Sequence, residues 1–472
     1  MIFFVCLQFS VISSLYSNVN LKPKQVICLE KMFLGVDTLA VLPTGYGKSL
    51  IYQLLPLMLF AKKMLEENPA QRLDYIDNIT SVLLVISPLN SLINDQVQKL
   101  LATGLRVTAL NVINNVSSLN EGEEIECDLT ERDKREKLAR GYYNLLFAHP
   151  EALISSRFGR EMVYSAPYQQ HVCAIVIDEA HCIIEWGDDF RQDYGRLSML
   201  CAAFPNVPVI AMTATANKQD RKRIKDSLCL LDCFELVANP DRKNIFYEKI
   251  FRPGQDIDAF EDICRPIAQD LLEKRVAYPL TIIYMPLKWC GFIYRLSESV
   301  LGVHQYYPPG SLPLPKNRLF AQFHAPQTVK MKIEILEQLN QQASKIRIVL
   351  ATVAFGMGVD IPSIRHVIHI GPPKTIREYF QETGRAGRDG QYSKATLYYN
   401  NRDIAKNKPG LQEEMRLYCQ SENHCLRILL LQCLDIKHPV SCFPGHLCCS
   451  VCKNICSCIE CSLNRMQPDI SD

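Results

Sequence analysis

Residues 41–49, which read Val-Leu-Pro-Thr-Gly-Tyr-Gly-Lys-Ser, constrain the fold of this chain more than any other stretch. They follow a short apolar run at residues 38–42 and precede a second apolar run at residues 50–59. A strand, a glycine-rich turn ending in Lys-Ser and a helix are typical of a phosphate-binding loop. The usual pattern begins with a glycine where this chain has Leu42, so a plain turn before a buried helix is the alternative interpretation.

The side chains of this loop suit a bound nucleotide. Gly45 and Gly47 let the backbone turn tightly, so that its N–H groups point inward at a phosphate. The helix that follows adds the positive end of its dipole. Lys48 is expected on the β- and γ-phosphates and Ser49 on Mg²⁺, with Thr44 in the same cradle.

Length and charge bound the remaining possibilities. A chain of 472 residues is too long for one hydrophobic core and fits two or three domains. The formal net charge is only +2, so any nucleic-acid surface must be local. Residues 1–17 are apolar but lack the positive segment and cleavage site of a signal peptide, so we interpret residues 1–20 as a poorly defined N-terminus. No other run approaches transmembrane length.

Two sets of apolar runs predict two α/β domains in tandem. The first set comprises residues 38–42, 82–86, 145–148, 174–177 and 209–212. The second set comprises residues 280–285, 346–351, 366–370 and 395–399. Continuous Val/Ile/Leu runs that alternate with helical stretches indicate a parallel sheet covered on both faces. We expect domains at residues 21–238 and 239–400, followed by a helical Cys-rich module at residues 401–472.

Two carboxylates follow the buried run at residues 174–177. Hydrolysis of a nucleotide needs one carboxylate to hold magnesium and a base to orient the attacking water. Asp178 suits the first task and Glu179 the second. Acidic pairs after strands are common, but this pair shares a predicted domain with Lys48, which strengthens the interpretation.

Two arginines of the second domain suit a γ-phosphate. Arg385 and Arg388 are three residues apart, so we expect them on one helix face, with Gly384 and Gly387 clearing space beside them. The guanidinium fork matches phosphate oxygens. An arginine supplied by a second domain speeds phosphoryl transfer and makes hydrolysis depend on domain closure.

Taken together, these motifs resemble superfamily-two helicases with a DEAH box, and among them the RecQ family of DNA helicases. The resemblance covers roughly residues 20–455 and rests on the motifs L-K-P-K-Q, L-P-T-G-Y-G-K-S, S-P-L-N-S-L-I-N-D-Q-V, V-I-D-E-A-H-C, A-M-T-A-T-A, A-F-G-M-G-V-D and Q-E-T-G-R-A-G-R-D-G, in that order. It implies two RecA-like domains and ATP-dependent 3′ to 5′ translocation on single-stranded DNA, with unwinding of forked or duplex DNA. It also implies work in DNA repair, recombination or replication and a nuclear location, with the cytoplasm as a second location.

The resemblance also assigns roles to single residues. Gln25 would read the adenine of ATP. The second domain would complete the nucleotide site with Gly358, Asp360, Gln381, Arg385 and Arg388. No membrane partner is implied.

A loop rich in aromatic residues follows the DEAH box and resembles the family's sensor of single-stranded DNA. Trp186 and Phe190 would stack on bases while Arg191 takes a phosphate. The alternative is an aromatic pair that packs into the core. Asp188 replaces the histidine usual in the family, and Glu185 adds a further negative charge, which predicts weaker coupling to DNA.

The Cys-rich module resembles the family's zinc-binding subdomain. A Cys-x-x-Cys pair with two distant thiolates supplies four soft ligands for a closed structural Zn²⁺ site, here Cys425, Cys442, Cys449 and Cys452. His446 is an alternative to Cys442, and Cys448 blurs the assignment. Cys456, Cys458 and Cys461 leave open a second ion.

Two other functions remain open from the sequence. Longer members of the family continue into a winged-helix domain, for which the printed sequence leaves no room, so a DNA-stimulated ATPase or translocase without processive unwinding is one alternative. A DNA-binding relic without catalysis is the other, and the intact Lys48, Asp178, Glu179 and Arg388 argue against it. RNA is a weaker substrate hypothesis than DNA.

Overall fold

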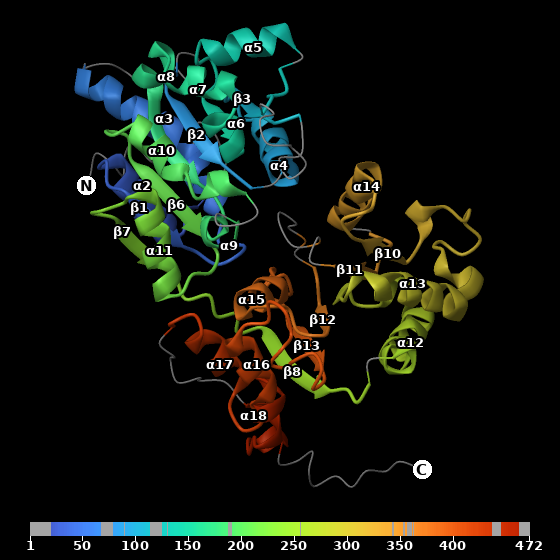
Figure 1. Ribbon diagram of the computed structural model, residues 1–472. Helices are drawn as coiled ribbons and strands as arrows, with labels where there is room; N and C mark the ends of the chain where they lie inside the picture. Colours follow the sequence, from blue (N-terminus) through green and yellow to red (C-terminus); the bar gives the residue numbers. More distant parts are fainter. Residues whose placement is uncertain are drawn as a thin grey trace, which may run out of the picture. The chain divides into compact units, whose positions relative to one another are not determined.

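The computed structural model describes residues 20–67, 79–88, 90–113, 125–129, 131–186, 191–254, 256–341, 344–352, 355, 361, 363–436 and 445–461. Contacts divide the chain into a first unit, which ends at Pro240, and a second unit, which begins at Asp241. Each unit is built on its own parallel sheet (Figure 1). The predicted fold class of two parallel-sheet domains is therefore confirmed, whereas the boundary predicted at residue 400 stays a prediction.

The first unit contains a sheet of seven strands in the order β3-β4-β2-β5-β6-β1-β7. All of its pairings are parallel. The strands are β1 (Thr38–Val41), β2 (Val82–Ile86), β3 (Val107–Leu110), β4 (Leu145–Ala148), β5 (Val172–Ile177), β6 (Val209–Thr213) and β7 (Phe234–Val237). The described helices are α2 (Pro23–Phe33), α3 (Lys48–Glu67), α4 (Asn90–Leu101), α5 (Arg132–Ala139), α6 (Pro150–Ile154), α7 (Arg157–Val163), α8 (Ala166–His171), α9 (Cys182–Trp186), α10 (Leu197–Ala203) and α11 (Lys218–Leu228).

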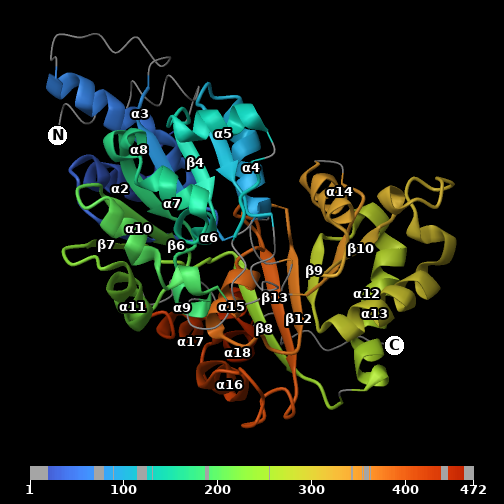
Figure 2. The ribbon, with the colours of Figure 1, turned by 45° about the horizontal axis from the view of Figure 1, so that its top comes forward.

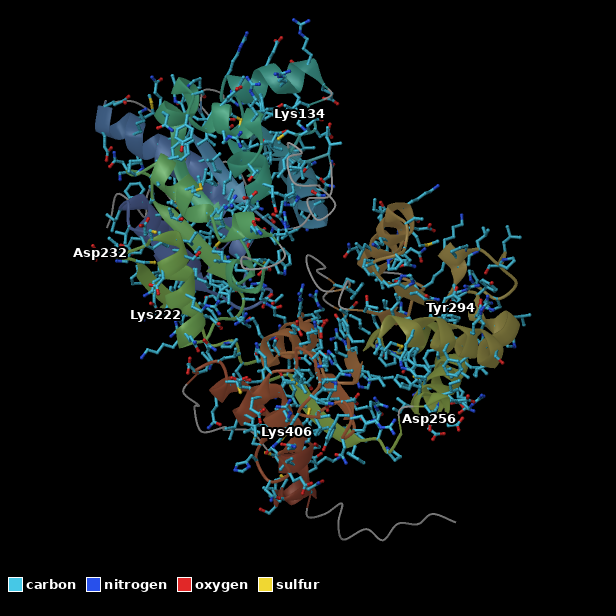
Figure 3. The ribbon with its side chains drawn as sticks, in the orientation of Figure 1. Lys134, Lys222, Asp232, Asp256, Tyr294 and Lys406 are labelled. Carbon is cyan, nitrogen blue, oxygen red and sulfur yellow. The ribbon has the colours of Figure 1, made fainter. Side chains whose placement is uncertain are left out.

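Helices cover both faces of this sheet, as Figure 2 shows. Successive side chains of a strand point to opposite faces, and the residues of β2 accordingly divide between two cores. Leu83 and Val85 pack with α2, α3 and α4, whereas Leu84 and Ile86 pack with the helices of the other face. Charged side chains such as Lys222 and Asp232, which Figure 3 labels, are exposed. Each strand therefore contributes side chains to two cores. This is why apolar and polar residues do not alternate along these strands in the sequence.

The second unit contains a parallel sheet of six strands in the order β10-β11-β9-β12-β13-β8. The strands are β8 (Ile245–Phe251), β9 (Thr281–Tyr284), β10 (Phe320–Phe323), β11 (Ile348–Ala351), β12 (His366–Ile370) and β13 (Ser393–Tyr399). Its described helices are α12 (Ile257–Lys274), α13 (Leu287–Leu301), α14 (Val329–Asn340), α15 (Ile376–Thr383), α16 (Glu413–Gln420), α17 (Leu426–Gln432) and α18 (Ser450–Asn454).

The Cys-rich module packs on the edge strand β8 of this second sheet. The Tyr247 N–H donates to the carbonyl of Cys448 over 3.3 Å. The Lys249 ammonium donates to the carbonyl of Cys419 over 2.7 Å. The Arg427 guanidinium donates to Asp241 over 2.6 Å, and both side chains are almost fully buried. These contacts make α16, α17 and α18 part of the second unit.

Within the part of the chain that the structure describes, no helix combines the length and the apolar character needed to cross a membrane.

Candidate functional site

Three neighbouring strands of the first sheet bring the predicted nucleotide residues to one edge. The strands β5, β6 and β1 are adjacent, and all of them run in the same direction. The phosphate loop follows β1, Asp178 follows β5, and Thr213 ends β6. In α/β proteins, ligands bind at the carboxyl ends of parallel strands, where the loops of neighbouring strands meet.

The phosphate loop depends on two glycines with left-handed backbone angles. Gly45 has φ +79° and Gly47 has φ +88°. A Cβ atom on Gly47 would lie 2.7 Å from the Gln25 side-chain nitrogen. That nitrogen donates to the carbonyl of Gly47 over 2.8 Å and to that of Tyr46 over 3.2 Å. Gln25 thus holds the loop from α2, while its predicted contact with adenine stays a prediction.

Lys48 is the first residue of α3 and reaches back across the loop. Its ammonium donates to the carbonyl of Leu42 over 3.2 Å. Thr44, Lys48 and Ser49 are partly exposed, as a loop that receives a ligand requires. The loop therefore offers a cation, a hydroxyl and a helix N-terminus to one place, and this combination suits a nucleotide phosphate with its divalent ion.

The carboxylate pair at the end of β5 combines a buried Asp178 with a partly exposed Glu179. Asp178 is 8% exposed, and its Oδ1 accepts the backbone N–H of Glu179 over 3.0 Å. Burial, followed by the neighbouring Glu179 carboxylate, raises the pKa of Asp178 to about 7, whereas Lys48 acts in the opposite direction. Glu179 has φ +49°, a left-handed conformation that is strained for a residue with a side chain. A bound divalent cation would relieve the repulsion between the two carboxylates.

His181 links the carboxylate pair to the end of β6, and the sequence analysis gave it no role. Its Nδ1 lies 3.4 Å from Glu179 Oε2 and 3.1 Å from the hydroxyl of Thr213. The Thr213 hydroxyl in turn donates to the carbonyl of Thr215 over 3.2 Å. The motif A-M-T-A-T-A, predicted to form a tight turn, is therefore in contact with the acid pair through one buried imidazole.

The structure describes only part of the loop predicted to contact DNA. Phe190, together with Asp188, lies outside the described residues. Trp186 ends α9, and its ring meets that of Tyr194 edge-on at 5.6 Å. The Arg191 guanidinium binds both carboxylate oxygens of the buried Glu151, each over 2.6 Å. A phosphate contact from Arg191 stays a prediction, and in this structure the guanidinium is engaged in an internal ion pair.

The two arginines of the second unit do not share a helix face, which corrects the prediction. Helix α15 ends at Thr383, and Arg385 and Arg388 lie in the turns that follow. Gly387 has φ +56°, and a Cβ atom there would lie 2.4 Å from the side-chain nitrogen of Asn244. The glycine-rich sequence thus stops the helix, because the backbone must pass close to its neighbour. Gln381 lies in the last turn of α15, and Gly358 and Asp360 are outside the described residues.

A buried contact between a histidine and a glutamate near these arginines has no counterpart in the sequence analysis. His369 Nε2 lies 2.7 Å from Glu382 Oε2, and both side chains are at most 7% exposed. The His369 ring stacks on that of Tyr284 with centroids 4.9 Å apart. Because His369 is on β12 and Glu382 on α15, the pair fastens the base of the glycine-rich turn to the sheet.

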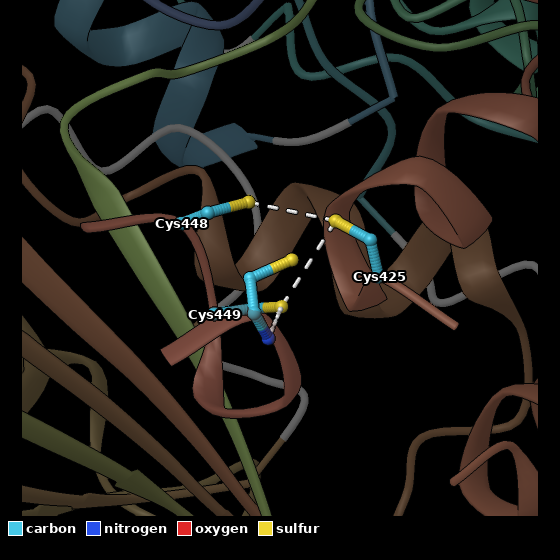
Figure 4. A group of neighbouring side chains, drawn as sticks. Cys425, Cys448 and Cys449 are labelled. Carbon is cyan, nitrogen blue, oxygen red and sulfur yellow. Dashed lines mark hydrogen bonds between the residues drawn. The ribbon is translucent and has the colours of Figure 1, made fainter. Parts of the chain in front are cut away.

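Four thiols of the Cys-rich module gather into a first cysteine group, comprising Cys425, Cys448, Cys449 and Cys452. Figure 4 shows Cys448 and Cys449 facing Cys425, whose sulfur lies 3.5 Å from that of Cys448 and 3.9 Å from that of Cys449. Tetrahedral zinc sites hold sulfur ligands at similar separations, since each Zn–S bond is about 2.3 Å. Cys442 lies outside the described residues, and Cys448 stands as the fourth thiol among those described.

Two family models match the chain. The DEAD/DEAH box helicase model matches residues 22–224, and the helicase conserved C-terminal domain model matches residues 311–390. The chain is 30% identical over 455 residues to the ATP-dependent DNA helicase Q1 of Mus musculus, covering 94% of this chain and 61% of that protein. It is 32% identical over 400 residues to the ATP-dependent DNA helicase RecQ of Haemophilus influenzae, covering 84% of this chain and 54% of that protein.

Solved structures show the same fold at low identity. A MrfA helicase bound to DNA matches with a TM-score of 0.59 and 17% identity over 83% of this chain and 50% of that chain. The DEAD-box helicase Mss116 bound to single-stranded RNA matches with a TM-score of 0.57 and 17% identity over 84% of this chain and 77% of that chain. The resemblance predicted from the motifs is confirmed, and the chain spans between 54% and 61% of the two relatives named above.

Proposed function

We propose that this chain, a homologue of the RecQ-type DNA helicases, is an ATP-dependent DNA helicase that moves 3′ to 5′ on single-stranded DNA and unwinds forked or duplex DNA. The observation that carries the proposal is the convergence of Lys48, Asp178 and Glu179 at one edge of the first sheet. The relatives named above, which are ATP-dependent DNA helicases, support the choice of DNA as the substrate.

In the first unit, the chain's own residues bind and orient the nucleotide. The phosphate loop cradles the phosphates with its backbone N–H groups, and Lys48 meets the β- and γ-phosphates. Ser49 and Asp178 would hold Mg²⁺, which supplies positive charge where the phosphates carry negative charge. Glu179 orients the attacking water and accepts its proton. The contact from Glu179 through His181 to Thr213 then couples changes at the nucleotide site to the end of β6.

In the second unit, Arg385 and Arg388 are proposed to stabilise the charge that develops on the transferred phosphoryl group, with Gln381, Gly358 and Asp360 in supporting positions. An arginine that must arrive from another unit makes hydrolysis depend on domain closure. Repeated closure and opening would advance the DNA strand, with Trp186 and Phe190 stacking on bases. We propose a nuclear location, in keeping with work on DNA.

The first cysteine group is proposed to hold a structural Zn²⁺. Four thiolates close the coordination sphere, so the ion would stabilise the module rather than catalyse a reaction. The module's contacts with β8 would transmit that stability to the second sheet. Cys442 remains a candidate ligand by resemblance.

A translocase with little unwinding activity is the second candidate. The internal ion pair of Arg191 with Glu151 favours it, because this guanidinium is then unavailable to a DNA phosphate. The acidic Glu185, next to Trp186 in the sequence, points in the same direction.

The test measures ATP hydrolysis with and without single-stranded DNA, and strand separation of forks that carry a 3′ or a 5′ tail. Lys48→Ala should abolish hydrolysis, whereas Lys63→Ala, on the exposed side of the same helix, should leave it unchanged. DNA-stimulated hydrolysis with separation of the 3′-tailed fork supports the helicase. Hydrolysis without separation supports the translocase, and DNA binding without any hydrolysis overturns both.

A further inference from the structure

A second group of metal-ligating side chains lies beyond the first cysteine group. His446, Cys456, Cys458 and Cys461 place one ligand atom each within 4.8 Å of one another, and the two groups have no residue in common. His446 lies in the short 3-10 helix Gly445–Leu447, before α18, and the three cysteines follow that helix. The polypeptide therefore leaves α18 and returns its thiols to an imidazole that precedes it.

The distances within this second group suit one ion. His446 Nδ1 lies 3.3 Å from Cys458 Sγ and 3.8 Å from Cys456 Sγ. A tetrahedral zinc with Zn–S bonds of about 2.3 Å and a Zn–N bond of about 2.0 Å places its ligand atoms roughly 3.5–3.8 Å apart. A single hydrogen bond from a thiol explains one short distance to a nitrogen. It does not explain two thiols converging on the same nitrogen with a third nearby.

The other nitrogen of the imidazole has the partner that metal-bound histidines usually have. His446 Nε2 lies 3.2 Å from Glu460 Oε2. A carboxylate in this position keeps the proton on Nε2 and turns the Nδ1 lone pair toward the ligand group. Glu460 is 71% exposed, so the contact orients the ring and adds little stability by itself.

The segment around the second group buries few apolar side chains that could stabilise its conformation. Ile455 is 74% exposed and Ile459 is 81% exposed. The loop is nevertheless tightly folded, because a Cβ atom on Gly445 would lie 3.3 Å from the Cβ atom of Cys456. Short segments that cannot form a hydrophobic core are commonly held by a metal. All the described cysteines are free thiols, so no disulfide among them does this work.

We propose that His446, Cys456, Cys458 and Cys461 bind a second structural Zn²⁺, separate from any ion in the first cysteine group, with Glu460 orienting the imidazole. Three thiolates and one imidazole form a closed tetrahedral site without an open position for a substrate. The second ion fastens the end of the module to Gly445 and so fixes the segment that carries Cys449 and Cys452 from both sides.

The first test counts zinc by mass spectrometry in the full-length chain after dialysis against metal-free buffer. The expected content is two zinc ions per chain, falling to one in Cys458→Ser and staying at two in Cys229→Ser, a control at an exposed cysteine outside both groups. One zinc per chain in the wild type and still one in Cys458→Ser would overturn the proposal.

A second variant keeps the proposal testable if Cys458→Ser misfolds. Glu460→Gln retains all four ligands and removes only the carboxylate that orients the ring. Loss of such a partner weakens metal binding about 10- to 100-fold, so competition with a chelator should release one zinc at a lower chelator concentration than in the wild type, while the other is retained equally. If Glu460→Gln and the wild type released both zinc ions at the same chelator concentrations, the proposed role of His446 as a ligand would be contradicted.

Discussion

The two units bury acidic side chains in opposite ways, although both are built on parallel sheets. In the first unit, Asp178 and Glu179 are adjacent, and burial together with like charge raises the pKa of Asp178 to about 7. In the second unit, Glu382 meets His369 at 2.7 Å. The Glu382 carboxylate thus has a partner within the protein, whereas the strain on Asp178 and Glu179 would be relieved by a bound cation. The comparison indicates that the electrostatically strained carboxylates belong to the candidate catalytic site, whereas the paired glutamate supports the fold.

The largest effect should come from the strained pair. Glu179→Gln removes the residue proposed as the base for the attacking water, so ATP turnover with single-stranded DNA should fall about 10³-fold. Circular dichroism should show an unchanged fold. Glu161→Gln, at an exposed position on α7, is the matched control and should retain full turnover. Turnover within tenfold of the wild type in Glu179→Gln would break the comparison.

Loss of the His369–Glu382 contact should instead lower the stability of the second unit. Glu382→Ala leaves His369 buried without its carboxylate, so the free energy of unfolding of the second unit should fall by about 3 kcal/mol. The chain has two tryptophans, and in a Trp186→Phe background the fluorescence of Trp289 follows urea unfolding of the second unit alone.

The control for this measurement is Glu337→Ala on the exposed face of α14, which should change the free energy of unfolding by less than about 0.5 kcal/mol. Equal effects of the two variants would show that the His369–Glu382 pair contributes nothing beyond an ordinary surface residue.

Gln25→Ala tests how far the phosphate loop near Asp178 and Glu179 depends on its support from α2. The side chain holds the carbonyls of Tyr46 and Gly47, so its loss should raise the KM for ATP about tenfold, equivalent to about 1.4 kcal/mol. If Gln25 also reads adenine, the preference for ATP over GTP should disappear in the variant. Equal weakening of both nucleotides would limit Gln25 to holding the loop.

The smallest effect should be the pH dependence of the nucleotide-free first unit. The pKa of Asp178 is raised from 3.8 to about 7, so between these values the native state holds a proton that the unfolded chain has released. The free energy of unfolding therefore falls as the pH rises through this window. Asp178→Asn removes this fall, so its melting temperature should exceed that of the wild type by several degrees at pH 7.5.

At about pH 4 the two proteins should melt together, because the carboxyl group is then protonated in the native wild type. The fluorescence of Trp186 in a Trp289→Phe background follows the first unit. Asp226→Asn, at an exposed position on α11, serves as the control. Parallel pH profiles for Asp178→Asn and the wild type would contradict the strain assigned to this carboxylate.

Much of the fold was predictable because buried parallel strands read as continuous apolar runs. The strands that escaped prediction include β7 and β10, which have four residues each and lie at the sheet edges. Edge strands are covered less completely, and Glu235 and Gln322 interrupt their apolar character. A short, half-polar strand carries too little pattern to be distinguished from a loop.

The candidate site divides in the same way. The phosphate loop and Asp178 follow strands directly, so local sequence places them at one sheet edge. The grip of Gln25 on the loop, the contact of His181 with Thr213 and the pair of His369 with Glu382 join elements that meet only in the folded chain. No spacing rule identifies such pairs. The turn at Arg385 was mistaken for helix because the close approach of Gly387 to Asn244 is also a tertiary contact.

The buried contact between Arg427 and Asp241 has a mechanical consequence. Asp241 is the first residue of the second unit, directly after Pro240 of the first, and Arg427 lies two residues after a thiol of the first cysteine group. The ion pair therefore anchors the first residue of the second unit to the Cys-rich module. If the first cysteine group holds zinc as proposed, removal of the metal should loosen this anchor. ATP would then still be hydrolysed, but less DNA would be moved for each molecule hydrolysed.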